Sequence, residues 1–166
     1  MRSLPIIALL LLLPLACSNT GAPMEAGRIA PDFRAQDLTG RTVYLNAELK
    51  RPVVLTFFAT WCEPCRKEIP LLIDLHDGMQ NRITILCLAV DPENLDKLKS
   101  MSAELHIPYA VLLDEQRKIM DAYGVSELPS TFLIGTDGRI VSRFRGFDDA
   151  AAQSIVDMVR RLEAAQ

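Results

Sequence analysis

Short apolar runs alternate with stretches of helical periodicity along most of this chain. The unbroken apolar runs at residues 53–59 and 83–90 have the length and the β-branched content of buried strands. Between them, apolar residues recur at helical spacing over residues 62–77, and Gly78 is expected to end that helix. A strand, a helix and a second strand in this order are typical of an α/β protein.

The remainder of the chain continues this alternation. Further strands are predicted at residues 42–45, 109–113, 131–134 and 139–145. Helices are predicted from a cap at Asp91, over residues 115–123, and from a cap at Asp148 to about Glu163. The last strand alternates apolar with basic side chains, which is typical of an antiparallel strand with one exposed face.

The amino terminus has the pattern of an export signal. Arg2 precedes an apolar run, residues 4–16, that is too short to cross a bilayer as a helix. We therefore predict a signal peptide at residues 1–16 and, because residues 17–26 are mostly small and polar, a flexible tether. The rest, residues 27–166, has the size of one domain with its own core.

Composition narrows the function classes. The formal net charge is −3 and no basic run occurs, so nothing in the sequence indicates a nucleic-acid partner. The four cysteines do not form the dense pattern of a disulfide-stapled scaffold. Cys17 follows the signal, Cys62 and Cys65 are a close pair, and Cys87 lies in an apolar run where we expect a core residue.

The run Trp61-Cys62-Glu63-Pro64-Cys65 carries the candidate chemistry. If Cys62 begins the helix and Cys65 lies one turn further, their sulfurs are within disulfide distance. The free N–H groups and the dipole at the helix start favour a Cys62 thiolate. We expect Cys62 to be the exposed nucleophile and Cys65 the buried resolving thiol. Pro64 is tolerated in the first turn because its missing N–H would be unpaired there.

Two other uses of such a pair are less well supported. A structural zinc site needs four ligands, and the sequence contains no second CxxC and no pair of closely spaced histidines. A permanent disulfide that closes so short a loop would add little stability. Redox exchange is therefore the favoured interpretation, with no metal site and no cofactor.

Three segments together resemble the TlpA/ResA-like thiol-disulfide oxidoreductases of the thioredoxin-like superfamily. Residues 57–70 resemble the active-site segment of this exported branch, and residues 125–132 resemble the loop that carries its cis-proline. Residues 30–40 are similar to the AhpC/TSA-Redoxin-like amino-terminal extension. The resemblance implies a thioredoxin-like fold, with a central mixed β-sheet flanked by helices and an N-terminal β extension.

The resemblance also implies roles for individual residues. Pro129 would be the cis-proline beside the cysteines, although a trans loop proline is the alternative that the residues alone allow. The backbone of Leu128 would then pair with an extended partner peptide. Glu68 would lie near the cysteines and tune their pKa or move a proton, the alternative being a solvated helix residue. Trp61 would shield the pair and contact the partner, or simply pack.

Residues 13–17 resemble the lipobox of bacterial lipoproteins. Ala16 and Cys17 match the pattern, whereas Pro14 and Leu15 depart from it. The resemblance implies cleavage before Cys17 and lipid modification of its sulfur. We therefore expect a lipoprotein of the cell envelope that faces the periplasm or the outside.

The expected activity is the reduction of protein disulfides outside the cytoplasm. In this branch the haem-attachment thiols of apocytochrome c are a frequent target, and a membrane thiol carrier supplies the electrons. A peroxiredoxin-like peroxidase is one alternative, but it needs a Thr-x-x-Cys arrangement and Thr60 stands two residues before Cys62. A copper-delivery protein is the other, and its histidine ligand would have to be His76 or His106, the two histidines of the chain.

Overall fold

A computed structural model describes residues 26–79 and 81–164 of the chain. The predicted signal peptide, Cys17 and all of the predicted tether except its last residue lie outside the described residues. No helix among the residues that the structure describes has both the length and the apolar character needed to span a membrane.

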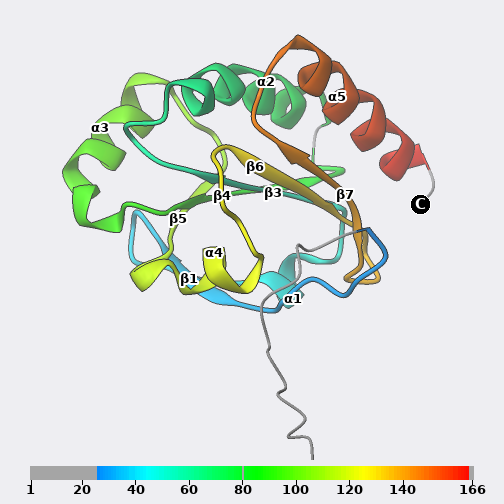
Figure 1. Cartoon of the computed structure of the whole chain (residues 1–166), viewed down its shortest axis with the longest axis horizontal. Helices are drawn as coiled ribbons and strands as arrows, with labels where there is room; N and C mark the ends of the chain where they lie inside the picture. The colour runs from blue at the N-terminus through cyan, green and yellow to red at the C-terminus, as the bar shows by residue number, and fades with distance from the viewer. Residues whose placement is uncertain (1–25, 80, 165–166) are drawn as a thin grey trace, which may run out of the picture.

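Seven strands form one mixed sheet in the order β2-β1-β5-β4-β3-β6-β7 (Figure 1). In chain order they are β1 (Arg34–Asp37), β2 (Thr42–Tyr44), β3 (Val53–Phe58), β4 (Thr84–Ala89), β5 (Ala110–Leu113), β6 (Ser130–Ile134) and β7 (Ile140–Arg145). The three central strands β3, β4 and β5 are parallel, and the other pairings are antiparallel. The predicted α/β class with a central mixed sheet is confirmed.

Helices cover both faces of this sheet. They are α1 (Leu45–Glu48), α2 (Glu63–Met79), α3 (Leu95–Glu104), α4 (Lys118–Ala122) and α5 (Asp149–Ala164), with short 3-10 turns at Pro92–Asn94 and Glu115–Arg117. Figure 1 shows α2, α3 and α5 on one face and the shorter α1 and α4 on the other. The long helix α2 therefore lies over the central strands and presents its first turn at one end of the sheet.

Two local predictions were wrong. Gly78 does not end α2, which continues to Met79; the left-handed conformation that commonly follows a helix occurs at Asn81, with φ of 68°. Asp91 is the residue before a 3-10 turn that starts with Pro92, as predicted, but its carboxylate accepts no capping hydrogen bond from a backbone N–H of that turn; it accepts hydrogen bonds from Thr60 instead.

The N-terminal extension spans the molecule from edge to edge. The hairpin of β1 and β2 adds to the sheet beside β5, while Ile29 forms an isolated antiparallel bridge with Arg139 at the opposite edge. Between these points, the buried Tyr123 hydroxyl donates a 2.9 Å hydrogen bond to the Pro31 carbonyl. The extension is thus part of the domain and confirms the predicted β addition.

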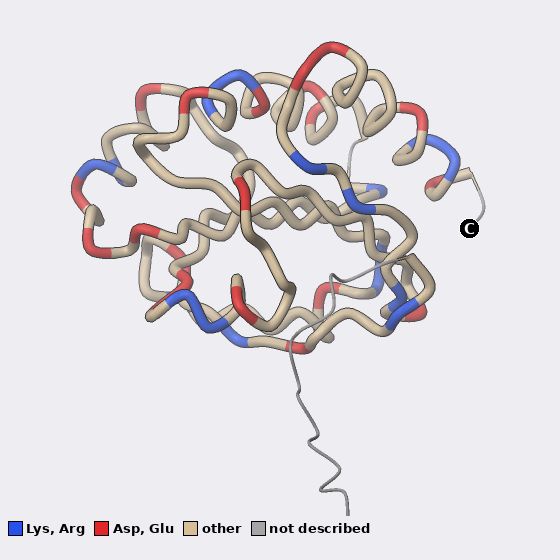
Figure 2. The backbone as a smooth tube through the Cα atoms, in the orientation of Figure 1, with Lys and Arg blue, Asp and Glu red and all other residues tan. Residues whose placement is uncertain are grey.

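The core of the domain is continuous and mainly apolar. Every residue of β3 is buried, and the ring of Phe132 packs edge to face against both Phe57 and Tyr123 on one side of the sheet. Cys87 is buried within β4 as a free thiol, as expected of a core residue. Charged residues of both signs are interleaved along the outer segments instead of gathering on one element (Figure 2).

Candidate active site

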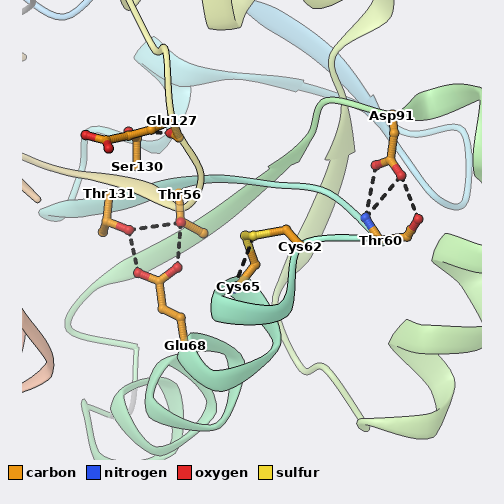
Figure 3. Close-up of a disulfide and its surroundings, with 9 residues drawn as sticks. All are labelled: Thr56, Thr60, Cys62, Cys65, Glu68, Asp91, Glu127, Ser130 and Thr131. Atoms are coloured by element: carbon orange, nitrogen blue, oxygen red, sulfur yellow. Dashed lines mark hydrogen bonds between the residues drawn. A yellow bond between two sulfur atoms is a disulfide. The ribbon is translucent and has the colours of Figure 1, made fainter. Parts of the chain in front are cut away.

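The paired cysteines lie where β3 passes into α2. Cys62 immediately precedes the helix, and its carbonyl accepts the first helical hydrogen bond from the Arg66 N–H at 3.3 Å. The Cys65 N–H, one of the donors that a helix start leaves without a backbone partner, points at the Cys62 sulfur at 3.2 Å. The two cysteines form a disulfide in this structure (Figure 3). The predicted position of the pair on the helix is therefore observed.

Cys62 was expected to be exposed and Cys65 buried, but the structure buries both. Cys62 is 4% exposed and Cys65 1%, so neither is open in the oxidised protein. The disulfide turns the Cys62 sulfur inward, toward Cys65 and its N–H. The accessible surface here belongs to Trp61, which is 63% exposed, and to Glu63 and Pro64. Trp61 thus does not simply pack into the core.

A buried carboxylate holds the loop before the cysteines. Asp91, fully buried at the end of β4, accepts hydrogen bonds from the Thr60 N–H at 3.0 Å and the Thr60 hydroxyl at 2.6 Å (Figure 3). The Asn94 side-chain amide donates a third at 3.3 Å. The sequence predicted only a helix cap at Asp91, because the partner Thr60 is 31 residues away. These bonds tie the ends of two parallel strands together beside Cys62.

Thr60→Val is expected to lower the free energy of unfolding by about 1–3 kcal/mol, because it removes one donor from a buried carboxylate while it preserves side-chain shape. Urea unfolding of the oxidised protein measures this change. Thr42→Val is the matched control, since Thr42 is exposed on β2 and should shift the midpoint little. Equal midpoints for the two variants would contradict a role for Thr60 in holding the loop.

The loop before β6 lies beside the cysteine-bearing end of β3. Ser130, the first residue of β6, pairs with Phe57 in the antiparallel register. The preceding peptide bond, Leu128–Pro129, is cis, as the resemblance implied. Pro129 is buried and its carbonyl accepts a 2.8 Å hydrogen bond from the Gly146 N–H. Within the described residues, no hydrogen bond engages the backbone N–H or C=O of Leu128.

Glu68 is 1% exposed, so the alternative of a solvated helix residue is wrong. It lies one turn after Cys65 on the same face of α2 and points at the sheet (Figure 3). One carboxylate oxygen is 2.9 Å from the Thr56 hydroxyl, and the other is 2.5 Å from the Thr131 hydroxyl. Thr56 is the direct neighbour of Thr131 on β6 and of Cys87 on β4. Glu68 therefore packs over a row of three residues, one from each of these adjacent strands.

Burial sets the acidity of this cluster. It raises the pKa of Glu68 to about 7, although the two threonine hydroxyls act in the opposite direction. Burial, together with the nearby Glu68, also raises the pKa of the Cys87 thiol well above its usual value. The pKa of Tyr109 is raised mainly by burial as well. A carboxyl that titrates near neutral pH can both accept and release a proton during thiol chemistry.

The two histidines lie apart from the cysteines. His76 is in the last turn of α2, eleven residues after Cys65, which corresponds to about 16 Å along the helix axis. Its ring is 3.1 Å from the Asp77 carboxylate and packs near Tyr109. His106 follows α3 with a left-handed backbone. Among the described residues, no group of three or more potential ligand side chains is arranged to hold a metal ion.

A cysteine pair at the start of a helix, reached from a central strand and flanked by a cis-proline loop, defines a thioredoxin-fold dithiol–disulfide protein. Residues 26–143 match the model of the AhpC/TSA family. The chain is also 33% identical over 124 residues to the thiol-disulfide oxidoreductase ResA of Bacillus thuringiensis (strain Al Hakam), covering 74% of this chain and 71% of that protein. The chain therefore belongs to the AhpC/TSA family, among its ResA-like thiol-disulfide oxidoreductases.

Solved structures agree with this assignment. A protein from Chlorobium tepidum assigned as thiol:disulfide interchange protein DsbE has a TM-score of 0.79 and 26% identity, covering 84% of this chain and 99% of that one. Peroxidoxin BcpB from Mycobacterium tuberculosis has a TM-score of 0.73 and 27% identity, with 84% and 98% covered. The fold is thus shared by a protein named for disulfide interchange and by one named a peroxidoxin, so the fold alone does not choose between these two classes.

Proposed function

We propose that this protein is an exported reductant of protein disulfides that acts through Cys62 and Cys65. The observation that carries the proposal is the placement of the pair at the start of α2, beside a Leu128 backbone that has no hydrogen-bond partner among the described residues. A substrate peptide that pairs with this loop would therefore lie beside the cysteines.

The exchange begins with the reduced protein. The Cys62 thiolate attacks one sulfur of the substrate disulfide; a Cys62–substrate disulfide forms, and the other substrate sulfur leaves as a thiolate. The Cys65 thiol then transfers its proton to the ionised Glu68 carboxylate. The resulting Cys65 thiolate attacks Cys62, which forms the internal disulfide and releases the second substrate thiolate. The substrate gains two electrons, and the cysteine pair loses them.

Three neighbouring residues orient the substrate in this scheme. An extended peptide that adds as a strand to Leu128 would place its disulfide next to Cys62, because Pro129 precedes the strand that pairs with the end of β3. Trp61 offers an exposed aromatic surface on the other side of the cysteines. Such surfaces are common where one protein binds another.

The direction of electron flow and the partners rest on the resemblance to the exported ResA-like branch. We assign reduction as the physiological direction, apocytochrome c with its paired haem-attachment cysteines as a candidate substrate, and a membrane thiol carrier as the electron donor. A peptide that contains an oxidised Cys-x-x-Cys-His motif, together with a small aromatic disulfide, tests this directly. We expect the reduced protein to reduce the peptide and the small disulfide stoichiometrically. If it reduced neither of them, or only one, the result would contradict the proposal.

The predicted processing at Cys17 is testable by intact mass spectrometry of the protein purified from membranes. We expect the chain to begin at Cys17 with added diacylglycerol and acyl mass, and we expect Cys17→Ala to appear in the soluble fraction without that mass. An unacylated N-terminus downstream of Cys17 would contradict the lipoprotein assignment. The site lies outside the described residues, so only the mature protein can report on it.

A peroxidase function is the second candidate, favoured by the similarity to peroxidoxin BcpB. A peroxidatic cysteine of this fold uses a threonine three residues earlier, but here Thr60 is two residues before Cys62 and its hydroxyl donates to Asp91. We therefore expect peroxide consumption by the reduced protein to be slow relative to disulfide reduction. If the reduced protein consumed peroxide faster than it reduced disulfides, the peroxidase would become the favoured function and the disulfide reductant the second candidate.

Copper delivery is tested in parallel by titrating the reduced protein with Cu(I). The distance of His76 from the cysteines argues against a shared site, so we expect weak binding that does not depend on either histidine. Tight binding without disulfide exchange would favour a metal carrier over a reductant.

A further inference from the structure

The carboxyl group of Glu68 and the hydroxyl groups of Thr56 and Thr131 form a cluster in which each group lies within hydrogen-bond distance of the other two. The Thr56 hydroxyl is 2.9 Å from one carboxyl oxygen of Glu68, and the Thr131 hydroxyl is 2.5 Å from the other. The two hydroxyl oxygens are themselves 2.9 Å apart (Figure 3). All three residues are 1% exposed. The contacts therefore form a closed triangle away from bulk solvent.

The ionised and the protonated forms of Glu68 differ in the number of protons that are available for the three hydrogen-bond contacts. A threonine hydroxyl has one proton to donate, and an ionised carboxylate has none. With Glu68 ionised, two protons must serve three contacts, and one pair of oxygens faces each other without a hydrogen between them. With Glu68 protonated, three protons serve three contacts. Every group then donates once and accepts once.

We propose that Thr56 and Thr131 are positioning residues that close a ring of three hydrogen bonds with protonated Glu68 in the oxidised protein. The carboxyl group of Glu68 donates to Thr131 across the shortest contact. Thr131 donates to Thr56, and Thr56 donates back to the second carboxyl oxygen. In this ring Glu68 is held with its acid proton on the side of β6.

The role of the ring in disulfide exchange, described next, rests on the proposed function. When Cys65 gives up its proton, the proton passes to the Glu68 carboxylate and Cys65 becomes the thiolate that attacks Cys62. The ring is completed by that proton at the step that forms the internal disulfide. When a donor dithiol reduces the disulfide again, the same proton returns to the Cys65 sulfur, and the ring opens. One proton thus moves between two groups one helical turn apart.

No charge nearby opposes a protonated Glu68. On α2, Cys62 and Cys65 are joined in the disulfide and do not titrate. On β4, Cys87 is a buried neutral thiol, and Tyr109, just before β5, is a buried neutral phenol. From β3 and β6 the facing groups are the two threonines. No cationic group contributes to the acidity of Glu68.

Infrared spectroscopy of the purified oxidised protein at pH 6 tests the ring. We expect a protonated carboxylic acid band that Glu68→Gln removes. Thr56→Val deletes the bond donated to the carboxyl C=O and should move that band to higher wavenumber, whereas Thr56→Ser keeps the hydroxyl and should leave it in place. Absence of the band in the wild-type protein overturns the ring, as does an unchanged band in Thr56→Val.

A kinetic measurement separates the ring from the exchange activity. Closure of the mixed disulfide should be about tenfold slower in Thr56→Val than in Thr56→Ser, because general-base transfer depends on the position of the base. Equal closure rates would overturn the positioning role, even if both variants fold normally. A wild-type protein that shows the acid band but exchanges no disulfides would contradict the proposed function alone. One that exchanges disulfides without the band would contradict the ring alone.

Discussion

Replacing Cys65 with serine is expected to abolish turnover and to leave the protein trapped on its substrate. Cys62 can still attack a disulfide, but the serine hydroxyl cannot displace the substrate sulfur, so the mixed disulfide persists. Non-reducing gel analysis and mass spectrometry after mixing reduced Cys65→Ser with a disulfide-containing peptide would detect a one-to-one adduct at Cys62. Turnover should fall to the uncatalysed background.

Cys87→Ser is the matched control for this trapping experiment. Cys87 is a thiol in the same chain, but it is buried in β4 and makes no disulfide. Its replacement should leave turnover close to that of the wild-type protein and should yield no persistent adduct. An adduct on Cys87, or normal turnover by Cys65→Ser, would contradict the assigned roles.

The second large effect concerns stability against pH. Burial raises the pKa of Glu68 from 4.5 to about 7, so the folded protein holds its proton where the unfolded chain has lost it. Relative to Glu68→Gln, the wild-type oxidised protein should therefore lose stability between pH 4.5 and 7 and lose no more above pH 7. The expected difference is about 3 kcal/mol, since each pKa unit corresponds to about 1.4 kcal/mol.

Urea unfolding of both oxidised proteins between pH 4 and 8 measures this difference directly. Other titrating groups cancel because the two proteins share them, and a glutamine amide can donate to Thr131 while its carbonyl accepts from Thr56. A constant difference across the pH range would show that Glu68 titrates normally. In the reduced protein, the same substitution should shift the Cys62 titration and slow exchange; an unchanged thiol titration would remove Glu68 from the mechanism.

Local sequence patterns are sufficient to predict the strands and the helix that carry the cysteines. The predicted bounds of β3, α2 and β4 agree with the structure within two residues, because each is a long, strongly periodic or wholly apolar segment. The position of Cys62 before the helix and Cys65 within it follows from the same pattern. The short β1 was not predicted, because four residues with alternating burial give too little signal.

The polar network around the site could not be predicted because its partners are distant in sequence. Thr56 and Thr131 look like ordinary strand residues, and only the antiparallel register of β3 and β6 places them under Glu68. Asp91 has the local pattern of a helix cap, but the parallel ends of β3 and β4 bring it to Thr60. The burial of Cys62 was likewise not predicted, because the sequence pattern indicates only that Cys62 precedes the helix.

The proposed function requires Cys62 and Cys65 to form a reducing dithiol. The most direct measurement is equilibration of the folded protein in dithiol–disulfide buffers, with alkylation and mass spectrometry to identify the titrating cysteines. We expect one two-electron transition confined to Cys62 and Cys65, at a potential nearer to the value of about −270 mV for thioredoxin than to that of strong periplasmic oxidants. A potential near about −120 mV, or a transition that involves Cys87, would contradict the claim.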